Sequence, residues 1–323
     1  MNPVSRREVL ALVTLMVTGC GPSAPEMPAP RQGGGTSLVG RVPAAASWQA
    51  GAGEVRPQLK ELASRLAESA GTWTGGAHTA ADLRMRLSAA GFAPALARPT
   101  GALLADAPEA SLVVTYPQYG GLRDGRASVM VTAEQTLVTG DSLARRGLTL
   151  DVRLIQRAAD AWTVETVSAG VPRPASLPLD AGRQAVLDDP RITLPAAAAA
   201  DVRAGVVDSD VLEMLSGLAG EYELTVTVLV TGHPRNVFGT DRISKHTLGR
   251  AVDIWRIDGY TVSDPTIPRH LVTSVMRRAA ELGATEIGGP VDLDARRGGI
   301  FFTDEVHRDH LHLGVPGAED AGA

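Results

Sequence analysis

The sequence of 323 residues is poor in cysteine, lysine and aromatic side chains, and it lacks long hydrophobic runs. The single cysteine, Cys20, excludes a disulfide within the chain and a zinc site built from several thiolates. Only Lys60 and Lys245 are lysines, the formal net charge is −5, and no basic cluster indicates a nucleic-acid partner. The apolar run over residues 9–17 is far below the about 20 residues that a membrane-spanning helix needs.

The first 20 residues have the features of an export signal that ends in a lipid anchor. Arg6 and Arg7 precede the apolar run, and the four residues Val17-Thr18-Gly19-Cys20 resemble a bacterial lipobox. We therefore expect cleavage before Cys20 and lipidation of that cysteine, which anchors the protein to the outer face of the bacterial cytoplasmic membrane. The arginine pair also resembles a twin-arginine signal, so Sec and Tat export both stay open.

Histidine, by contrast, is concentrated in the last third of the chain, where all but one of the seven histidines lie. Two short stretches stand out, residues 244–253 and 307–314. Catalytic zinc sites use three histidine or carboxylate ligands and leave a position for water. The candidates for these three ligands are His246, Asp253 and His312.

The local pattern of the first stretch brings two of these ligands together. Residues 250–255 alternate as a short strand, with Asp253 on one face. Gly249 permits a tight reversal just before the strand. We therefore expect His246 to fold back beside Asp253.

The second stretch predicts another short strand. Leu311 and Leu313 alternate with His310 and His312, so a strand here buries the leucines and presents both histidines on one face. Strict alternation places Asp309 on the opposite face, unless the strand begins after Asp309 or is bulged there.

The pattern S-x-H-x-x-G-x-A-x-D, followed later by D-H-L-H, resembles the zinc D-alanyl-D-alanine peptidases and the related hedgehog N-terminal domain. The resemblance covers roughly residues 224–315. It implies a D,D-peptidase that hydrolyses peptidoglycan stem peptides and binds zinc through His246, Asp253 and His312. It also implies that Asp309 is the general base and that His310 stabilises the developing oxyanion.

One part of the pattern differs from that family. In that family the strand before the first motif ends in an S-G-Y-R-like turn whose arginine helps to bind substrate, whereas residues 231–235 here read Thr-Gly-His-Pro-Arg. The candidate substrate contacts are Arg235, Arg242 and Ser244. This difference keeps a second interpretation open, in which an inactive peptidase fold binds the cell wall or a protein. The remaining histidines of this half are interpreted as surface or supporting residues: His233, His270 and His307.

We expect an α+β protein with two domains. Helical periodicity over 55–70 and after Thr79 precedes four β-type runs, and the first two runs are expected to join through a turn at Gly120-Gly121. This order resembles the NTF2-like or cystatin-like class, whose role here could be to bind a partner. The predicted divisions are a signal peptide (1–20), a flexible Pro/Gly linker (21–47), the NTF2-like domain (48–170), a packing segment (171–208) and the peptidase-like domain (209–323).

Overall fold

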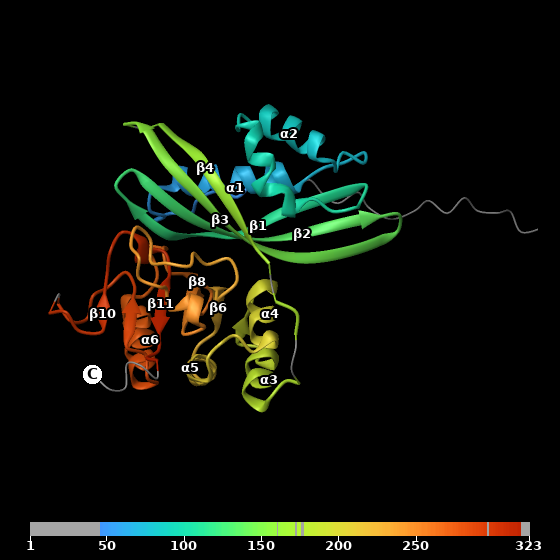
Figure 1. The fold of residues 1–323 in the computed structure, drawn as a ribbon. Coiled ribbons are helices and arrows are strands. Elements are labelled where there is room, and N and C mark those ends of the chain that lie inside the picture. The colour runs from blue at the N-terminus through green and yellow to red at the C-terminus, as the bar shows by residue number, and fades with distance from the viewer. Residues whose placement is uncertain (1–45, 160, 172, 176–177, 296, 318–323) are drawn as a thin grey trace, which may run out of the picture. The chain divides into compact units, whose positions relative to one another are not determined.

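The computed structural model describes residues 46–159, 161–171, 173–175, 178–295 and 297–317. These residues form six α-helices and two β-sheets, which confirms the expected α+β class (Figure 1). The predicted lipidation site, Cys20, lies outside the described residues. Among the described residues, no helix has both the length and the apolar character that crossing a membrane requires.

The first sheet is a four-stranded antiparallel meander in which each strand pairs with the next. Two helices precede it and bury their apolar sides in a shared core with the sheet. Thr79 begins the second helix with a reciprocal capping box to Asp82, as the local sequence favours. The elements are α1 (Pro57–Gly71), α2 (Ala80–Ala89), β1 (Glu109–Arg123), β2 (Arg126–Thr139), β3 (Ser142–Ala158) and β4 (Ala161–Gly170).

The expected turn at Gly120-Gly121 is wrong, because both glycines lie inside β1 and the chain reverses at 124–125. Register shifts interrupt the pairing of β1 on both sides of residues 116–119. Glycine instead allows another part of the chain to pack closely against β1, since a Cβ on Gly121 would lie 2.1 Å from Cγ of Phe238. A bulged strand with glycine marks such an approach as readily as it marks a turn.

The second sheet is seven-stranded and mixed, with the order β10-β9-β11-β7-β6-β5 and with β8 paired to β7. Its strands are short, and helices α5 and α6 pack their apolar sides into its core. The strands are β5 (Ile192–Thr193), β6 (Leu224–Val228), β7 (Ala251–Ile257), β8 (Tyr260–Thr261), β9 (Glu286–Gly288), β10 (Phe301–Phe302) and β11 (Leu311–Gly314). The helices are α3 (Ala181–Asp188), α4 (Ala196–Ala204), α5 (Ser209–Ala219) and α6 (Arg269–Glu281).

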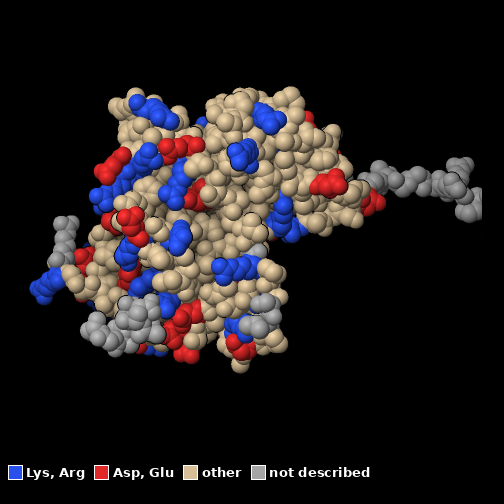
Figure 2. All heavy atoms as spheres, viewed as in Figure 1, with Lys and Arg blue, Asp and Glu red and all other residues tan. Residues whose placement is uncertain are grey.

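Each sheet has its own hydrophobic core, yet the described residues from 46 onward belong to one compact unit. Contacts between β1 and the second sheet include the stacked rings of Tyr116 and Trp255, whose centroids are 4.2 Å apart. On the face drawn in Figure 2, acidic and basic side chains are intermixed rather than gathered in separate fields. We call residues 46–170 the N-terminal half and residues 178–317 the C-terminal half.

Candidate metal centre

The two motifs meet because β11 pairs antiparallel with β7 and places His312 directly opposite Asp253. The strand β11 begins at Leu311, after Asp309, and its two leucines are buried as predicted. His246 lies on a single 3₁₀ turn that Gly249 ends in the left-handed region, at φ 74°. A Cβ on Gly249 would lie 2.1 Å from a backbone oxygen, so glycine is needed for this reversal.

Three ligand atoms from these residues form a small buried triangle. The Nε2 atom of His246 lies 3.1 Å from Oδ1 of Asp253 and 3.2 Å from Nδ1 of His312. The Nδ1 atom of His312 lies 3.0 Å from the same Asp253 oxygen. The ligand atoms of a tetrahedral zinc site are separated by about 3.3 Å, given zinc–ligand bonds of about 2.0 Å. The spacing and the donor set therefore fit a zinc ion.

Hydrogen bonds outside this triangle orient His246 and Asp253, whereas Nε2 of His312 has only a carboxylate nearby, beyond hydrogen-bond distance. The Nδ1–H of His246 donates to the carbonyl of Leu229 at 2.6 Å, which leaves the Nε2 lone pair facing the triangle. Nε2 of His312 lies 3.6 Å from Oε1 of Glu286. The other oxygen of Asp253 accepts a hydrogen bond of 2.6 Å from a side-chain amide of β1. Such outer partners are typical of metal centres.

Two imidazole nitrogens and a carboxylate oxygen this close require a proton or a cation between them. In the metal-free protein that proton resides on His312. Burial opposes its charge, but the hydrogen bond to Asp253 and the nearby negative charges of Asp253 and Glu286 outweigh burial and raise the pKa of His312 to about 9. A metal ion would replace this proton.

His233 stands beside the triangle, although its sequence pattern indicated only a surface or supporting residue. Its ring stacks on His246 with centroids 4.1 Å apart, and its Nδ1–H donates to the carbonyl of Pro234. Burial lowers the pKa of His233 well below its usual value, so the ring is neutral. The ligand atoms of His233, His246 and Asp253 lie within 4.8 Å of one another and could hold a metal ion.

Asp309 is completely buried and does not line the pocket that contains the three ligands. Its Oδ2 atom lies 2.5 Å from Nζ of Lys60 and accepts the backbone N–H of Tyr119. Its Oδ1 atom accepts the Nδ1–H of His310 at 2.5 Å. Burial alone would raise the pKa of Asp309, but Lys60 and His310 outweigh it and hold the pKa low. Asp309 is therefore an ionised group that orients His310.

A second carboxylate–histidine pair does line the pocket. Oδ1 of Asp304 lies 2.8 Å from Nδ1 of His307, whose ring is 5.1 Å from that of His310. Burial is the main cause that lowers the pKa of His307, so its ring is neutral near pH 7. With Nδ1–H donated to Asp304, Nε2 of His307 carries the lone pair and can accept a proton.

The three predicted substrate contacts are placed differently. Ser244 and Arg242 line the pocket, which has a volume of about 180 Å³. Ser244 is buried, and its Oγ accepts the N–H of His246, so it also supports the ligand turn. Arg242 is exposed and lies 3.4 Å from Glu286. Arg235 lies outside this pocket, in a neighbouring cleft.

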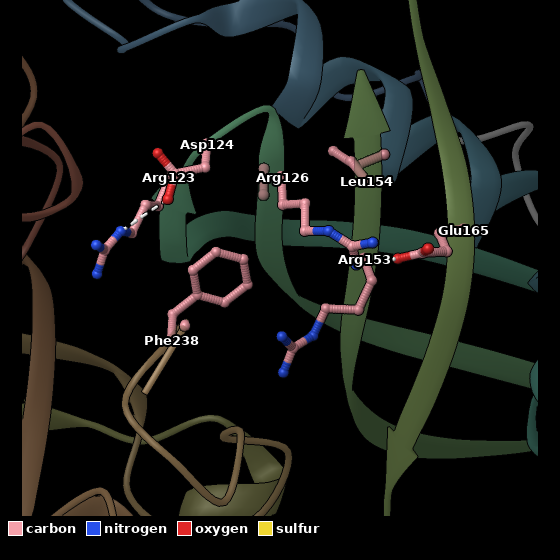
Figure 3. A pocket seen from close by; sticks show the side chains of 9 residues that line it. Arg123, Asp124, Arg126, Arg153, Leu154, Glu165 and Phe238 are labelled. Carbon is pink, nitrogen blue, oxygen red and sulfur yellow. Dashed lines mark hydrogen bonds and ion pairs between the residues drawn. The ribbon is translucent and has the colours of Figure 1, made fainter. Parts of the chain in front are cut away.

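Phe238 lines both the pocket of the three candidate ligands and a second cavity of about 370 Å³, which is shown in Figure 3. The charged lining of that cavity is Arg123, Asp124, Arg126, Arg153 and Glu165. Arg126 contacts Glu165 at 3.0 Å, and the guanidinium of Arg153 lies 5.2 Å from the Phe238 ring. Asp124 and Glu165 pair with two of the three arginines, and Arg153 pairs with Asp151 at 2.6 Å, so the cavity has little unpaired charge to attract an anion.

The sequence contained one overlooked signal for Lys60. It falls on the buried side of α1, together with Leu59 and Ala63, at a position where the periodicity of the helix demands an apolar residue. A lysine there indicates a buried partner of opposite charge. No sequence signal of this kind indicated which residue of β1 would contact Asp253.

Comparison with protein-family models, curated proteins and solved structures finds no match to this chain.

Proposed function

We propose that this protein is a zinc-dependent hydrolase of the D,D-peptidase type, acting on peptidoglycan stem peptides and anchored to the cell envelope through Cys20. The observation that carries the proposal is the triangle of His246, Asp253 and His312, with mutual separations of 3.0–3.2 Å at the floor of a pocket. The substrate class and the anchor are supported by the sequence resemblances alone.

Zinc bound there would polarise a peptide carbonyl and lower the pKa of a coordinated water toward about 7. The surrounding residues divide the proton transfers. Nε2 of His307, oriented by Asp304, is placed to accept the proton that water loses when it adds to the carbonyl. That proton is then available to the leaving amine. His310, held by Asp309, presents its Nε2 at 3.8 Å from Asp253, where an N–H on this nitrogen would donate to the oxygen that gains charge.

A second candidate function is a metal-bearing binding module without hydrolytic activity. His233 favours it, because a fourth protein ligand would close the coordination sphere as in structural zinc sites. The open site is preferred because the triangle with His312 has the separations of a tetrahedral site. In the set that includes His233, the ligand atoms are only within 4.8 Å of one another, which is wider.

The test measures zinc content and hydrolysis of a synthetic pentapeptide ending in D-Ala-D-Ala. We expect one zinc per chain in the wild type and in His233→Ala, and loss of zinc and activity in His312→Ala. His270→Ala, which changes an exposed histidine of α6, is the matched control and should behave as wild type. Unchanged zinc in His312→Ala would contradict the ligand set. Zinc loss in His233→Ala, with no cleavage by the wild type, would select the binding module.

The base is tested at equal zinc occupancy. We expect His307→Ala to keep zinc and to lose about 10²–10⁴-fold in turnover, the usual contribution of a general base. Wild-type turnover in His307→Ala, together with such a loss in Asp309→Asn, would return the role of base to Asp309.

A further inference from the structure

The N-terminal half reaches the metal centre through Gln118, a residue of β1 that is completely buried. Its Nε2 atom donates to Oδ2 of Asp253 at 2.6 Å, while Oδ1 of the same carboxylate faces His246 and His312. The carboxylate therefore has one oxygen committed to a partner and one committed to the ligand triangle. The two residues are 135 positions apart in the chain.

The pairing of β1 is irregular on both sides of Gln118. Register shifts between Val114 and Tyr116, and between Tyr119 and Gly121, enclose the short segment that carries Gln118. Bulges re-aim side chains of a strand and are over-represented beside functional sites. The same segment donates the backbone N–H of Tyr119 to Asp309. Two neighbouring residues of one strand thus hold the carboxylates of both C-terminal motifs.

We propose that Gln118 is a positioning residue of the metal centre, which makes the N-terminal half an integral part of that centre. The amide fixes the rotamer of Asp253 so that a single oxygen, Oδ1, is presented to the metal ion. Without the amide, Oδ2 loses its hydrogen-bond donor in a buried position and the carboxylate is free to turn. Partners of metal ligands typically contribute 10–100-fold to metal affinity.

This inference rests on the metal site of the proposed function, but not on catalysis. Its test is the zinc dissociation constant of the full chain, measured by competition with a chromophoric chelator. Gln118→Met keeps the length of the side chain and removes the donor, and we expect it to weaken zinc binding about 10–100-fold. The ligand field of the cobalt-substituted protein should change with it, because the carboxylate moves.

The matched control is Gln135→Met. Gln135 is also completely buried in the first sheet, but its amide donates to the carbonyls of Gly71 and Leu103, away from the metal pocket. Removing it costs both of these hydrogen bonds and also the bond that Nε of Arg146 donates to Oε1 of Gln135 at 2.7 Å, so the control disturbs the sheet at least as much and should still leave the zinc affinity unchanged. A general loosening of the fold would weaken both variants alike.

Equal zinc affinity in Gln118→Met and wild type overturns the inference, and so does an equal loss in Gln135→Met. If Gln118→Met does not fold, Gln118→Asn takes its place, because it keeps the amide but is one methylene too short to reach Asp253. A zinc affinity equal to that of the wild type in Gln118→Asn would also overturn the inference. Failure of the proposed function is distinguishable: the zinc-loaded wild type then cleaves no peptide, while the difference between the glutamine variants persists. A wild type that binds no zinc rejects both proposals.

Discussion

The two halves of the molecule contribute unlike parts to one site. The C-terminal half, built on short strands and tight turns, supplies all the candidate ligands: His233, His246, Asp253 and His312. The N-terminal half, built on long strands, supplies the groups that hold acidic residues in place, such as Lys60 and Gln118. Short strands bring ligands of distant segments close together, whereas a long sheet offers a rigid surface against which those ligands can be oriented.

Two ion pairs between these halves sharpen the comparison, since they differ in burial. The pair of Lys60 and Asp309 is fully buried, whereas Arg56 and Glu305 meet at 2.8 Å with side chains 43% and 44% exposed. Removing one partner of a buried pair leaves an uncompensated charge in a medium of low dielectric, whereas water screens the exposed pair.

The largest effect is expected for the buried pair. Lys60→Met should lower the free energy of unfolding by about 3–5 kcal/mol, because Asp309 and Glu54 lose their shared cation. Urea denaturation measures this change. The double variant Lys60→Met, Asp309→Asn should recover part of the loss, since it removes one of the two unpaired charges. A loss below about 1 kcal/mol in the single variant would show that the buried pair is no stronger than a surface pair.

The next effect in size is the expected dependence of zinc affinity on pH. Because the pKa of His312 is about 9 in the metal-free fold, zinc must displace a proton below that pH. The apparent zinc affinity should therefore fall about tenfold for each pH unit from about 9 down to about 7. In the metal-free protein, the same proton stabilises the fold fully below the unfolded pKa of 6.5, and this contribution is lost as the pH rises through about 9.

Zinc titrations at several pH values check this slope. Glu286→Gln removes one of the causes that raise the pKa of His312, so its affinity should depend less steeply on pH. A zinc affinity that is independent of pH in the wild type would show that His312 is not the ligand that zinc deprotonates.

The smallest effect is expected for the exposed pair. Arg56→Ala should change the free energy of unfolding by less than about 1 kcal/mol, and added salt should shrink the difference further. Denaturation at low and high ionic strength measures it. A change as large as that of Lys60→Met would mean that burial does not distinguish the two contacts.

Much of the site could be predicted because its ligands lie on short periodic segments. Alternation in β11 separates Leu311 and Leu313 from His312, and Gly249 marks the reversal that returns His246 to Asp253. These signals depend on residues a few positions apart. The register of β11 on β7, which brings both segments to one place, was not contained in either segment.

The remainder depends on packing between distant parts of the chain. Strict alternation would have placed Asp309 opposite His310 and His312, but β11 begins only at Leu311, so alternation does not decide where Asp309 lies. No local pattern indicated that Lys60 would contact it. The glycine pair Gly120-Gly121 predicted a turn, whereas β1 continues through both residues and Phe238 lies close to Gly121.

Sequence patterns thus predicted the α+β class, the two helices before the first sheet and the short strands of both motifs, and they pointed to the three residues that meet in the triangle. The groups that orient His246 and Asp253, and the position of His233 beside them, became visible only in the folded chain. The difference lies in the range of the interactions. Local patterns specify the face on which a side chain lies, whereas a hydrogen bond such as that of Gln118 to Asp253 forms only after two sheets have packed together.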